Sequence, residues 1–313
     1  MSEKPSTFTR VAYALLAYTV LVIVFGAWVR ISGSGAGCGQ HWPTCHGEIM
    51  HAPKSVETVI ELTHRVTSGL CMLGAFGLLI WGLKVFRRPH PVRWGVVLAM
   101  VFMIFEALLG AGLVLLELVG KNDSVSRAVM MAIHLSNTCL LTGAMAFVAW
   151  YADERGGGRA LRLRGAGLSA WLLIGGLVLV VVVSMSGAVT ALGDTLYPVA
   201  ADGTIEQHLI ADQSPTAHFL QRMRIVHPLL AVASGLYLLW LAIALPGMPN
   251  QPRVRSLGNL VAGLTVAQLC AGVVNIMLSA PGWMQLVHLA LATCLWIALV
   301  LLSLAALSDR GAS

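Results

Sequence analysis

Long apolar segments recur along the whole chain and alternate with short polar stretches. Eight of these segments, rich in Leu, Ala, Val and Gly, are long enough to cross the roughly 30 Å hydrocarbon layer of a membrane. Backbone groups in lipid must form hydrogen bonds within their own segment, so each segment is predicted to be a helix. The predicted spans are 11–30, 58–83, 92–118, 126–151, 166–190, 216–245, 256–279 and 283–307.

The composition agrees with repeated membrane spans. Of the 313 residues, 57% are hydrophobic and 11% are charged, whereas soluble domains carry roughly 25% charged residues. The first segment is expected to remain in the protein as a span, because no small-residue cleavage site follows it. The sequence therefore predicts an all-α polytopic membrane protein that is embedded in a lipid bilayer.

The distribution of basic residues predicts the orientation in the membrane. With the N-terminus in the cytoplasm, thirteen Lys and Arg residues fall in the inner loops and termini. The outer loops then hold four, which are Arg30, Lys54, Lys121 and Arg127. This positive-inside bias predicts a multi-pass protein of the cytoplasmic (inner) membrane with both termini in the cytoplasm. It also accounts for the net charge of +6, so no nucleic-acid partner is expected.

The two halves of the chain resemble each other. Matching glycine, histidine and acidic or amide residues recur at offsets of 154 to 163 residues. The matched pairs are Gly26 with Gly187, His64 with His227, Glu106 with Gln268, and His134 with His288. The repeat predicts two pseudo-symmetric four-helix bundles in the same membrane orientation. The predicted division is an N-terminal bundle at 1–154, a cytoplasmic linker at 155–164 and a C-terminal bundle at 165–313.

Four histidines lie inside the predicted spans, two in each half. They are His64, His134, His227 and His288. Each follows the outer end of its span closely enough to lie roughly 9–17 Å deep, so all four occupy one layer of the membrane. A lone membrane histidine is explained by a hydrogen bond to a neighbouring helix. Four in one layer favour ligand binding, because ionisable groups at this depth are costly and usually functional.

The pairing of these histidines favours heme over zinc. A zinc site needs three or four ligands that converge on one point, whereas heme takes one imidazole on each side from facing helices. His64 with His134 predicts one heme site in the first half. His227 with His288 predicts a second heme site in the second half.

The charged neighbours of the two predicted sites differ. Glu61 lies three residues before His64 on the same helix face, whereas Arg224 lies three residues before His227. This difference predicts chemistry at the first site and a permanent redox cofactor at the second. The candidates to bind heme propionates are Arg65, Arg222 and Arg224. Snorkelling to the membrane surface is the alternative role for these arginines.

Two cysteines, Cys38 and Cys45, lie in the first outer loop. On the oxidising side of the membrane they can form a structural disulfide or a thiol pair that cycles with an external redox partner. The spacing does not match the motif for covalent heme attachment. The sequence leaves the structural and the redox roles open.

A known family shares these motifs. Residues 26–47 read GAWVRISGSGAGCGQHWPTCHG, and this run resembles the first-loop signature of heme A synthases that contain cysteines. Glu61-x-x-His64-Arg65 and the run GAVTALGD at 187–194 resemble the same family. The likeness covers nearly the whole chain. It departs from the family pattern at Pro228, where Arg is expected after the histidine, and this weakens the propionate assignment of Arg222 and Arg224.

The resemblance implies that a porphyrin methyl group of heme O is oxidised to a formyl group, which gives heme A. It implies that heme O binds as substrate near His64 and His134, with Glu61 at the reacting methyl group. It further implies a resident heme b held by His227 and His288. Heme O synthase and cytochrome oxidase assembly are the partners that it implies.

Two other functions share the four histidines. A diheme b-type electron carrier would leave both hemes unmodified and would not need Glu61. A non-enzymatic heme carrier or assembly factor would bind heme reversibly at one site. The electron acceptor is not identified by the sequence, and a homo-oligomer is compatible with it.

Overall fold

We describe the protein from a computed structural model, for residues 6–48, 52, 54–153, 167–199, 205–244 and 252–308. This part of the chain is almost entirely helical. The predicted linker at 155–164 lies outside the described residues. The elements are α1 (Thr7–Ile31), η1 (Ser34–Ala36), α2 (Val56–Val85), α3 (Pro91–Leu115), α4 (Val125–Ala152), α5 (Gly167–Leu196), α6 (Ile205–Asp212), α7 (Phe219–Ala244), α8 (Pro252–Met277) and α9 (Gly282–Leu307).

Eight of the described helices are long and apolar enough to cross a membrane, which confirms the predicted fold class. Their outward faces carry large apolar side chains, among them the exposed Leu21, Trp94 and Ile243. Such surfaces are stable only against lipid, because water would be ordered around them at a cost of about 25 cal/mol per Å². The protein is therefore a multi-pass membrane protein.

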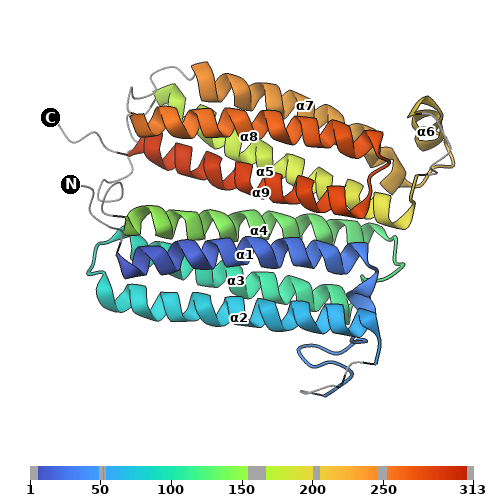
Figure 1. Cartoon of the computed structure of the whole chain (residues 1–313), viewed down its shortest axis with the longest axis horizontal. Coiled ribbons are helices and arrows are strands. Elements are labelled where there is room, and N and C mark those ends of the chain that lie inside the picture. Colours follow the sequence, from blue (N-terminus) through green and yellow to red (C-terminus); the bar gives the residue numbers. More distant parts are fainter. Residues whose placement is uncertain are drawn as a thin grey trace.

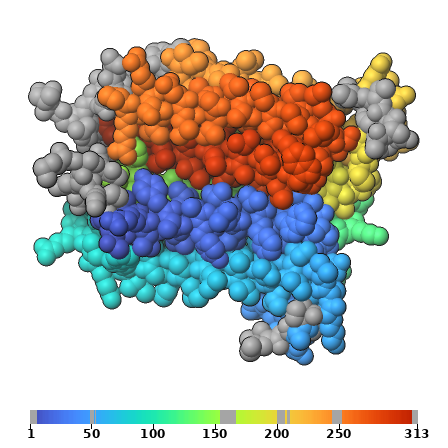
Figure 2. Space-filling model, in the orientation of Figure 1, coloured from blue at the N-terminus to red at the C-terminus, as the bar shows by residue number. Residues whose placement is uncertain are grey.

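The spans form two four-helix bundles that lie against each other along their length (Figures 1 and 2). One bundle contains α1 to α4, and the other contains α5, α7, α8 and α9. Between the bundles, α1 packs on α9 and α5 packs on α4. Because α1 corresponds to α5 and α4 to α9 in the sequence repeat, this packing is the one expected for an approximate twofold relation.

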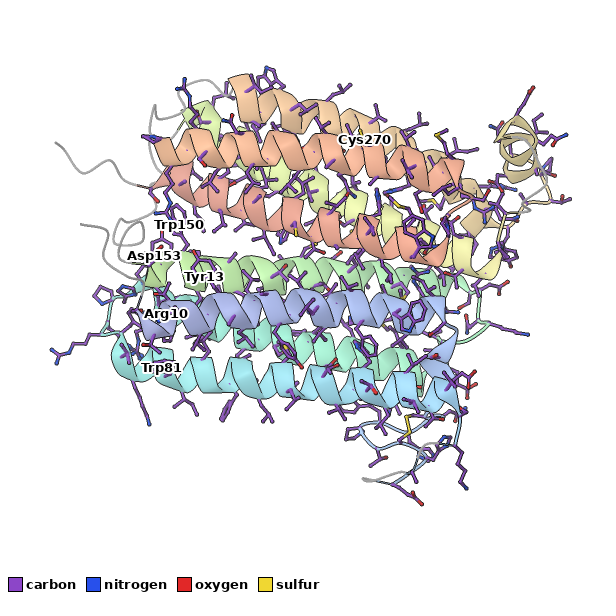
Figure 3. The ribbon with its side chains drawn as sticks, in the orientation of Figure 1. Arg10, Tyr13, Trp81, Trp150, Asp153 and Cys270 are labelled. Carbon is purple, nitrogen blue, oxygen red and sulfur yellow. A yellow bond between two sulfur atoms is a disulfide. The ribbon has the colours of Figure 1, made fainter. Side chains whose placement is uncertain are left out.

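The centre of the molecule is formed by α4 and α9. Half of the most apolar window of each is buried, against 17–28% in the other spans. Trp296 on α9 donates its indole N–H to the carbonyl of Cys139 on α4 at 2.7 Å. Near the end of α4, the Arg253 guanidinium of α8 lies 3.9 Å from the ring centre of Trp150 (Figure 3). Both contacts join the second bundle to α4.

Serine caps begin the two helices that carry the first pair of histidines. The Ser55 hydroxyl accepts from the Thr58 N–H at the start of α2, and the Ser124 hydroxyl accepts from the Arg127 N–H at the start of α4. Such a cap satisfies one of the free N–H groups of the first turn and typically stabilises a helix by about 1 kcal/mol. Both caps lie at the end of the molecule that also holds the first loop and α6 (Figure 1).

Several predicted boundaries are wrong. α5 continues to Leu196 instead of ending at 190, because arginines from other helices bind its last turn. α3 ends at Leu115 instead of 118, where Glu117 adopts a positive φ of 55°. The sixth span begins at Phe219 instead of 216, and the short helix α6 before it was not predicted.

A polar contact also joins the bundles outside the membrane spans. The Tyr197 hydroxyl, which follows α5, donates to the carboxylate of Asp123, which precedes α4. This hydrogen bond holds the pKa of Asp123 below its usual value and raises the pKa of Tyr197. The His218 ring stacks on Tyr197 with centroids 5.0 Å apart, so the start of α7 is part of the same contact.

Candidate functional site

His64 on α2 lies directly against Gly26 on α1. A Cβ atom at Gly26 would lie only 2.9 Å from Cε1 of the His64 ring, so a larger residue there would displace the imidazole. The Phe25 ring is 5.9 Å from the same imidazole, centre to centre. The absence of a side chain at Gly26 therefore creates the space in which His64 is held.

His227 on α7 has the same environment in the second bundle. A Cβ atom at Gly187 on α5 would lie 3.0 Å from Cε1 of His227. The neighbouring Ser186 hydroxyl is 2.9 Å from Nδ1 of the ring. Since Ser186 occupies Nδ1, Nε2 is the nitrogen that is left for a ligand. The glycine and histidine that match in the sequence repeat thus also match in space.

The other two histidines each lie beside a polar residue of the preceding span. His134 Nδ1 is 3.4 Å from Glu106 Oε1, although the pair lacks hydrogen-bond geometry. In the second bundle, His288 Nε2 is 3.1 Å from Gln268 Nε2. Glu106 also accepts hydrogen bonds from Asn137 at 2.6 Å and from Thr138. These hydrogen bonds of Glu106 join α3 to α4.

The structure brings His227 and His288 together across the second bundle. Their ring centres are 6.5 Å apart and the ring planes are nearly perpendicular, at 87°. Two imidazoles on opposite sides of one metal, with bonds of about 2 Å, would have ring centres roughly 6.3 Å apart. The spacing therefore fits one iron with two axial histidines.

His64 and His134 are the corresponding histidines of the first bundle. Nδ1 of His64, of His134 and of His288 is buried without a hydrogen-bond partner, which is uncommon for ring nitrogens away from water. No group of three His, Cys, Asp or Glu side chains in the described part of the chain is placed to hold a metal ion. Heme binding by the first pair stays a prediction.

Glu61 is buried on α2, one turn before His64, and is 4% exposed. One carboxylate oxygen accepts the backbone N–H of Cys38 at 2.8 Å. The other accepts from the guanidinium of Arg65, which lies one turn further along the helix. Charge-assisted bonds of this kind are short and strong, so Glu61 is fixed between the helix and the first loop.

The first loop is held over this carboxylate. Arg65 donates to the carbonyl oxygens of His41 and Thr44, both at 2.6 Å. Cys38 and Cys45 form a disulfide, which confirms the predicted pairing and leaves its structural or redox role a prediction (Figure 3). Both cysteines are buried, at 0% and 1% exposure. The disulfide closes the loop segment to which Glu61 and Arg65 bind.

The burial of the disulfide predicts resistance to reducing agents. We expect a phosphine reductant to leave the Cys38–Cys45 bond intact in the folded protein and to break it after denaturation. Alkylation with a maleimide followed by mass spectrometry measures both states, and the cysteines outside the disulfide are the internal control for labelling after denaturation. Rapid reduction of the folded protein would contradict this expectation and favour a redox-cycling pair.

The three candidate propionate-binding arginines all have partners within the protein. Arg65 binds Glu61 and the first loop, as described above. Arg222 donates to the carbonyl of Pro215 at 3.0 Å. Arg224 pairs with Asp194 at 2.8 Å and with Asp212 at 3.0 Å. Propionate binding by these residues stays a prediction, and none of the three is a free cation in this structure.

Comparison with known proteins places the chain in a family. The family model described as cytochrome oxidase assembly protein matches residues 9–300. The chain belongs to the cytochrome oxidase assembly protein family. A relative from Exiguobacterium sibiricum that is named heme A synthase is 26% identical over 296 residues, covering 94% of this chain and 92% of that protein. A heme A synthase from Halalkalibacterium halodurans is 32% identical over 137 residues, 44% and 43% of the two chains.

One group of relatives is about twice as long. A Thermus thermophilus protein named protoheme IX farnesyltransferase is 46% identical to this member of the cytochrome oxidase assembly protein family over 301 residues. The match covers 96% of this chain and 48% of that protein. The chain thus spans about half the length of the Thermus relatives that it matches.

The contacts of Arg30 in this family member were not predicted from the sequence. Arg30 ends the predicted span 11–30 and lies in the last turn of α1. Its side chain reaches α5 and α9 of the second bundle. The charge at the end of an apolar span was visible in the sequence, but its partners are more than 160 residues away. Arg127, inside the predicted span 126–151, lies near the start of α4.

Proposed function

We propose that this protein converts heme O into heme A for cytochrome oxidase by oxidising a porphyrin methyl group to a formyl group. Membership of the cytochrome oxidase assembly family and the likeness to heme A synthases support an enzyme of heme A biosynthesis. One structural observation carries the proposal further. Two geometrically equivalent histidine sites differ in charge, with Glu61 one turn from His64 and Arg224 one turn from His227.

The first bundle would bind the substrate. His64 and His134 are the residues that would hold the iron of heme O, and Gly26 gives the His64 ring its space. Asn137 and Thr138 bind Glu106, which lies beside His134.

Glu61 would serve the reaction at that methyl group. Oxidation of a methyl to a formyl group removes electrons and protons and adds an oxygen atom. A carboxylate fixed by the Cys38 N–H and by Arg65 can accept a proton or stabilise positive charge that develops on the substrate. The first loop covers this carboxylate, so its position does not depend on bulk water.

The second bundle would hold a resident heme b, which supplies one-electron chemistry when bound. His227 and His288 are the axial residues. Ser186 binds Nδ1 of His227 and leaves Nε2 for the metal, the arrangement by which metal-binding histidines are usually oriented. The neutral Gln268 lies beside His288 at the position that Glu106 occupies in the first bundle.

The substrate and the membrane orientation are part of the proposal. The Thermus relatives named protoheme IX farnesyltransferase join a region similar to this chain to further sequence. A farnesylating enzyme such as heme O synthase is therefore the proposed supplier of the substrate. From the distribution of basic residues, we place both termini in the cytoplasm and the Cys38–Cys45 loop on the outer face.

Expression in a host that makes heme O but not heme A tests the function. We expect extracted hemes to include heme A or its hydroxylated intermediate, identified by chromatography and mass spectrometry. A host that carries the empty vector gives the background. If only heme B and unchanged heme O are recovered with folded, heme-loaded protein, the chain is an electron carrier or a heme carrier, and the proposal is wrong.

A further inference from the structure

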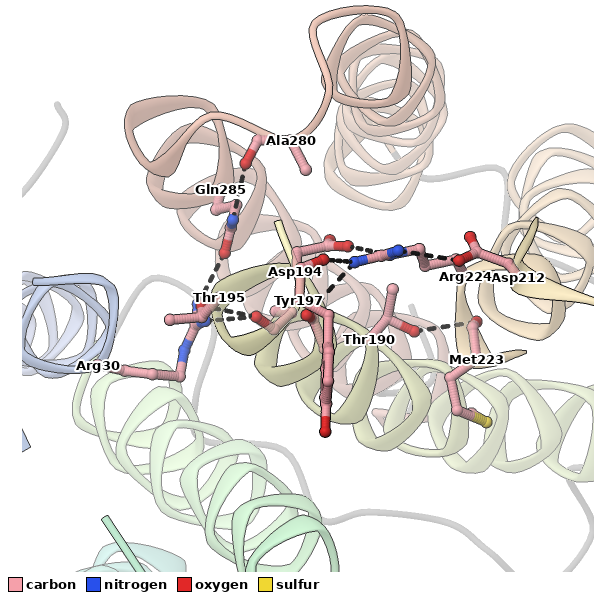
Figure 4. Close-up of polar contacts among 12 residues, drawn as sticks. Arg30, Thr190, Asp194, Thr195, Tyr197, Asp212, Met223, Arg224, Ala280 and Gln285 are labelled. Carbon is pink, nitrogen blue, oxygen red and sulfur yellow. Dashed lines mark hydrogen bonds and ion pairs between the residues drawn. The ribbon is translucent and has the colours of Figure 1, made fainter. Parts of the chain in front are cut away.

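Arg30 extends from the first bundle into the second. From the last turn of α1, its Nη1 atom donates to the carbonyl of Ala191 and to the Thr195 hydroxyl, both on α5. Its Nη2 atom donates to Gln285 Oε1 on α9 at 2.9 Å. Figure 4 shows the guanidinium between the two helices, with Gln285 held in turn by the carbonyl of Ala280.

No carboxylate in the described part of the chain forms an ion pair with Arg30. Asp194 is near enough to attract it, but its carboxylate is paired with Arg224 (Figure 4). The partners of Arg30 are a carbonyl, a hydroxyl and an amide, which solvate the cation without neutralising it. Because the guanidinium is partly buried between helices, its charge acts over a longer range than it would in water.

The cation contacts residues that lie about one helical turn from the second histidine pair. Gln285 precedes His288 by three residues on α9, so the two side chains share one face of the helix, roughly 4.5 Å apart along its axis. Ala191 follows Gly187, the residue that faces His227, by one turn of α5. The position of α5 that corresponds to Arg30 in the repeat is Ala191, so the second bundle has no cation of its own there.

The first histidine pair has the opposite charge. Glu106 Oε1 is 3.4 Å from Nδ1 of His134. The corresponding residue beside His288 is the neutral Gln268. At these two pairs of matching positions, the anion Glu106 lies beside the first histidine pair, whereas the cation Arg30 contacts α5 and α9 of the second bundle. A positive charge near a heme stabilises the ferrous form, and a negative charge stabilises the ferric form.

We propose that Arg30 and Glu106 set unequal reduction potentials at the two sites, so that an electron passes from the first site to the second. In this step, which rests on the proposed function, ferrous iron at the first site becomes ferric and ferric iron at the second becomes ferrous, with no proton transferred. Arg30 is a positioning and charge-bearing residue of the second site that belongs to the first bundle. Glu106 has the corresponding role at the first site.

Potentiometric titration of the full-length protein, purified with heme b and followed by visible spectroscopy, tests this inference. Arg30→Gln should shift the equilibrium of the second-site heme toward the ferric form by about tenfold, a fall of about 59 mV in its midpoint potential. Arg30→Lys keeps the charge and should shift it much less. Glu106→Gln should raise the potential of the first-site heme and leave the second unchanged. The second-site spectrum is identified with His64→Ala.

A matched control separates charge from packing. Thr195→Val removes a neutral partner of Arg30 and keeps the guanidinium, so the midpoint potential should stay close to that of the parent. Equal shifts in Thr195→Val and Arg30→Gln would assign Arg30 a purely structural role and overturn the inference. If Arg30→Gln fails to retain heme, the midpoint potential of the first-site heme in Glu106→Gln tests the inference. An unchanged first-site potential overturns it. If the enzyme makes heme A but neither Arg30→Gln nor Glu106→Gln changes a midpoint potential, the inference is refuted and the proposed function stands.

Discussion

Replacing Glu61 with alanine is expected to reduce heme A formation by about 10²-fold or more while both bundles still fold and bind heme. A positioned proton-transfer group typically contributes 10²–10⁴-fold to a rate. Glu61 is the buried carboxylate one turn from His64. In the described part of the chain it forms hydrogen bonds with the first loop and Arg65, and none with the second histidine pair. Heme extraction and the visible spectrum of purified protein measure the product and the heme content separately.

A second substitution separates the charge of Glu61 from its contact with the loop. Glu61→Gln can still accept the Cys38 N–H but has no charge and cannot take a proton as a carboxylate does. We expect it to be as inactive as Glu61→Ala but to keep the first loop in place, as shown by unchanged resistance of the disulfide to reduction. Normal heme A yield from Glu61→Gln would exclude the proposed role and leave Glu61 as an anchor of the loop.

Leucine at Gly26 is expected to remove heme from the first site alone. A Cβ atom there would lie 2.9 Å from the His64 ring, so the imidazole must move. Overpacking of this kind costs about 1–3 kcal/mol, which corresponds to about 5- to 150-fold weaker binding. Gly187→Leu should do the same to His227 in the second bundle. The hemes extracted from each purified variant, separated by chromatography and identified by mass, show whether heme O or heme B is lost and therefore which site is affected.

Gly69→Leu is the control for Gly26→Leu. Gly69 is on α2, as His64 is, but nothing lies within 4 Å of a Cβ atom added there. The control therefore adds the same side chain to the same bundle without contact to the ring. If Gly69→Leu loses heme as Gly26→Leu does, the effect reflects general damage to the bundle, and the contact between Gly26 and His64 does not determine binding.

The sequence predicted the fold well because its strongest signal is the one that lipid imposes. Apolar segments of about 20 residues have few alternatives to a membrane helix. The boundaries were less certain where polar residues belong to a helix. The sequence placed Asp194 and Thr195 in a loop after the fifth span. In the structure Arg224 binds Asp194 and Arg30 binds Thr195, and α5 extends to Leu196.

The candidate site was only partly predictable. The repeat identified the four histidines, and the structure shows that His227 and His288 face each other. The partners of the arginines could not be predicted, because Asp212 and the first loop approach them only after folding. Ser186 was missed for the same reason, since a serine in an apolar span usually bonds within its own helix.

The contact between Arg30 and Ala191 bears on how a duplicated protein can become asymmetric. The two residues are counterparts in the repeat, 161 positions apart, and one donates to the carbonyl of the other. In a homodimer of identical halves, an arginine at one position would face a second arginine across the symmetry axis, and the two cations would repel each other. Joining both halves in one chain allows alanine on one side, so a single charge can occupy the axis and serve only one of two otherwise similar sites.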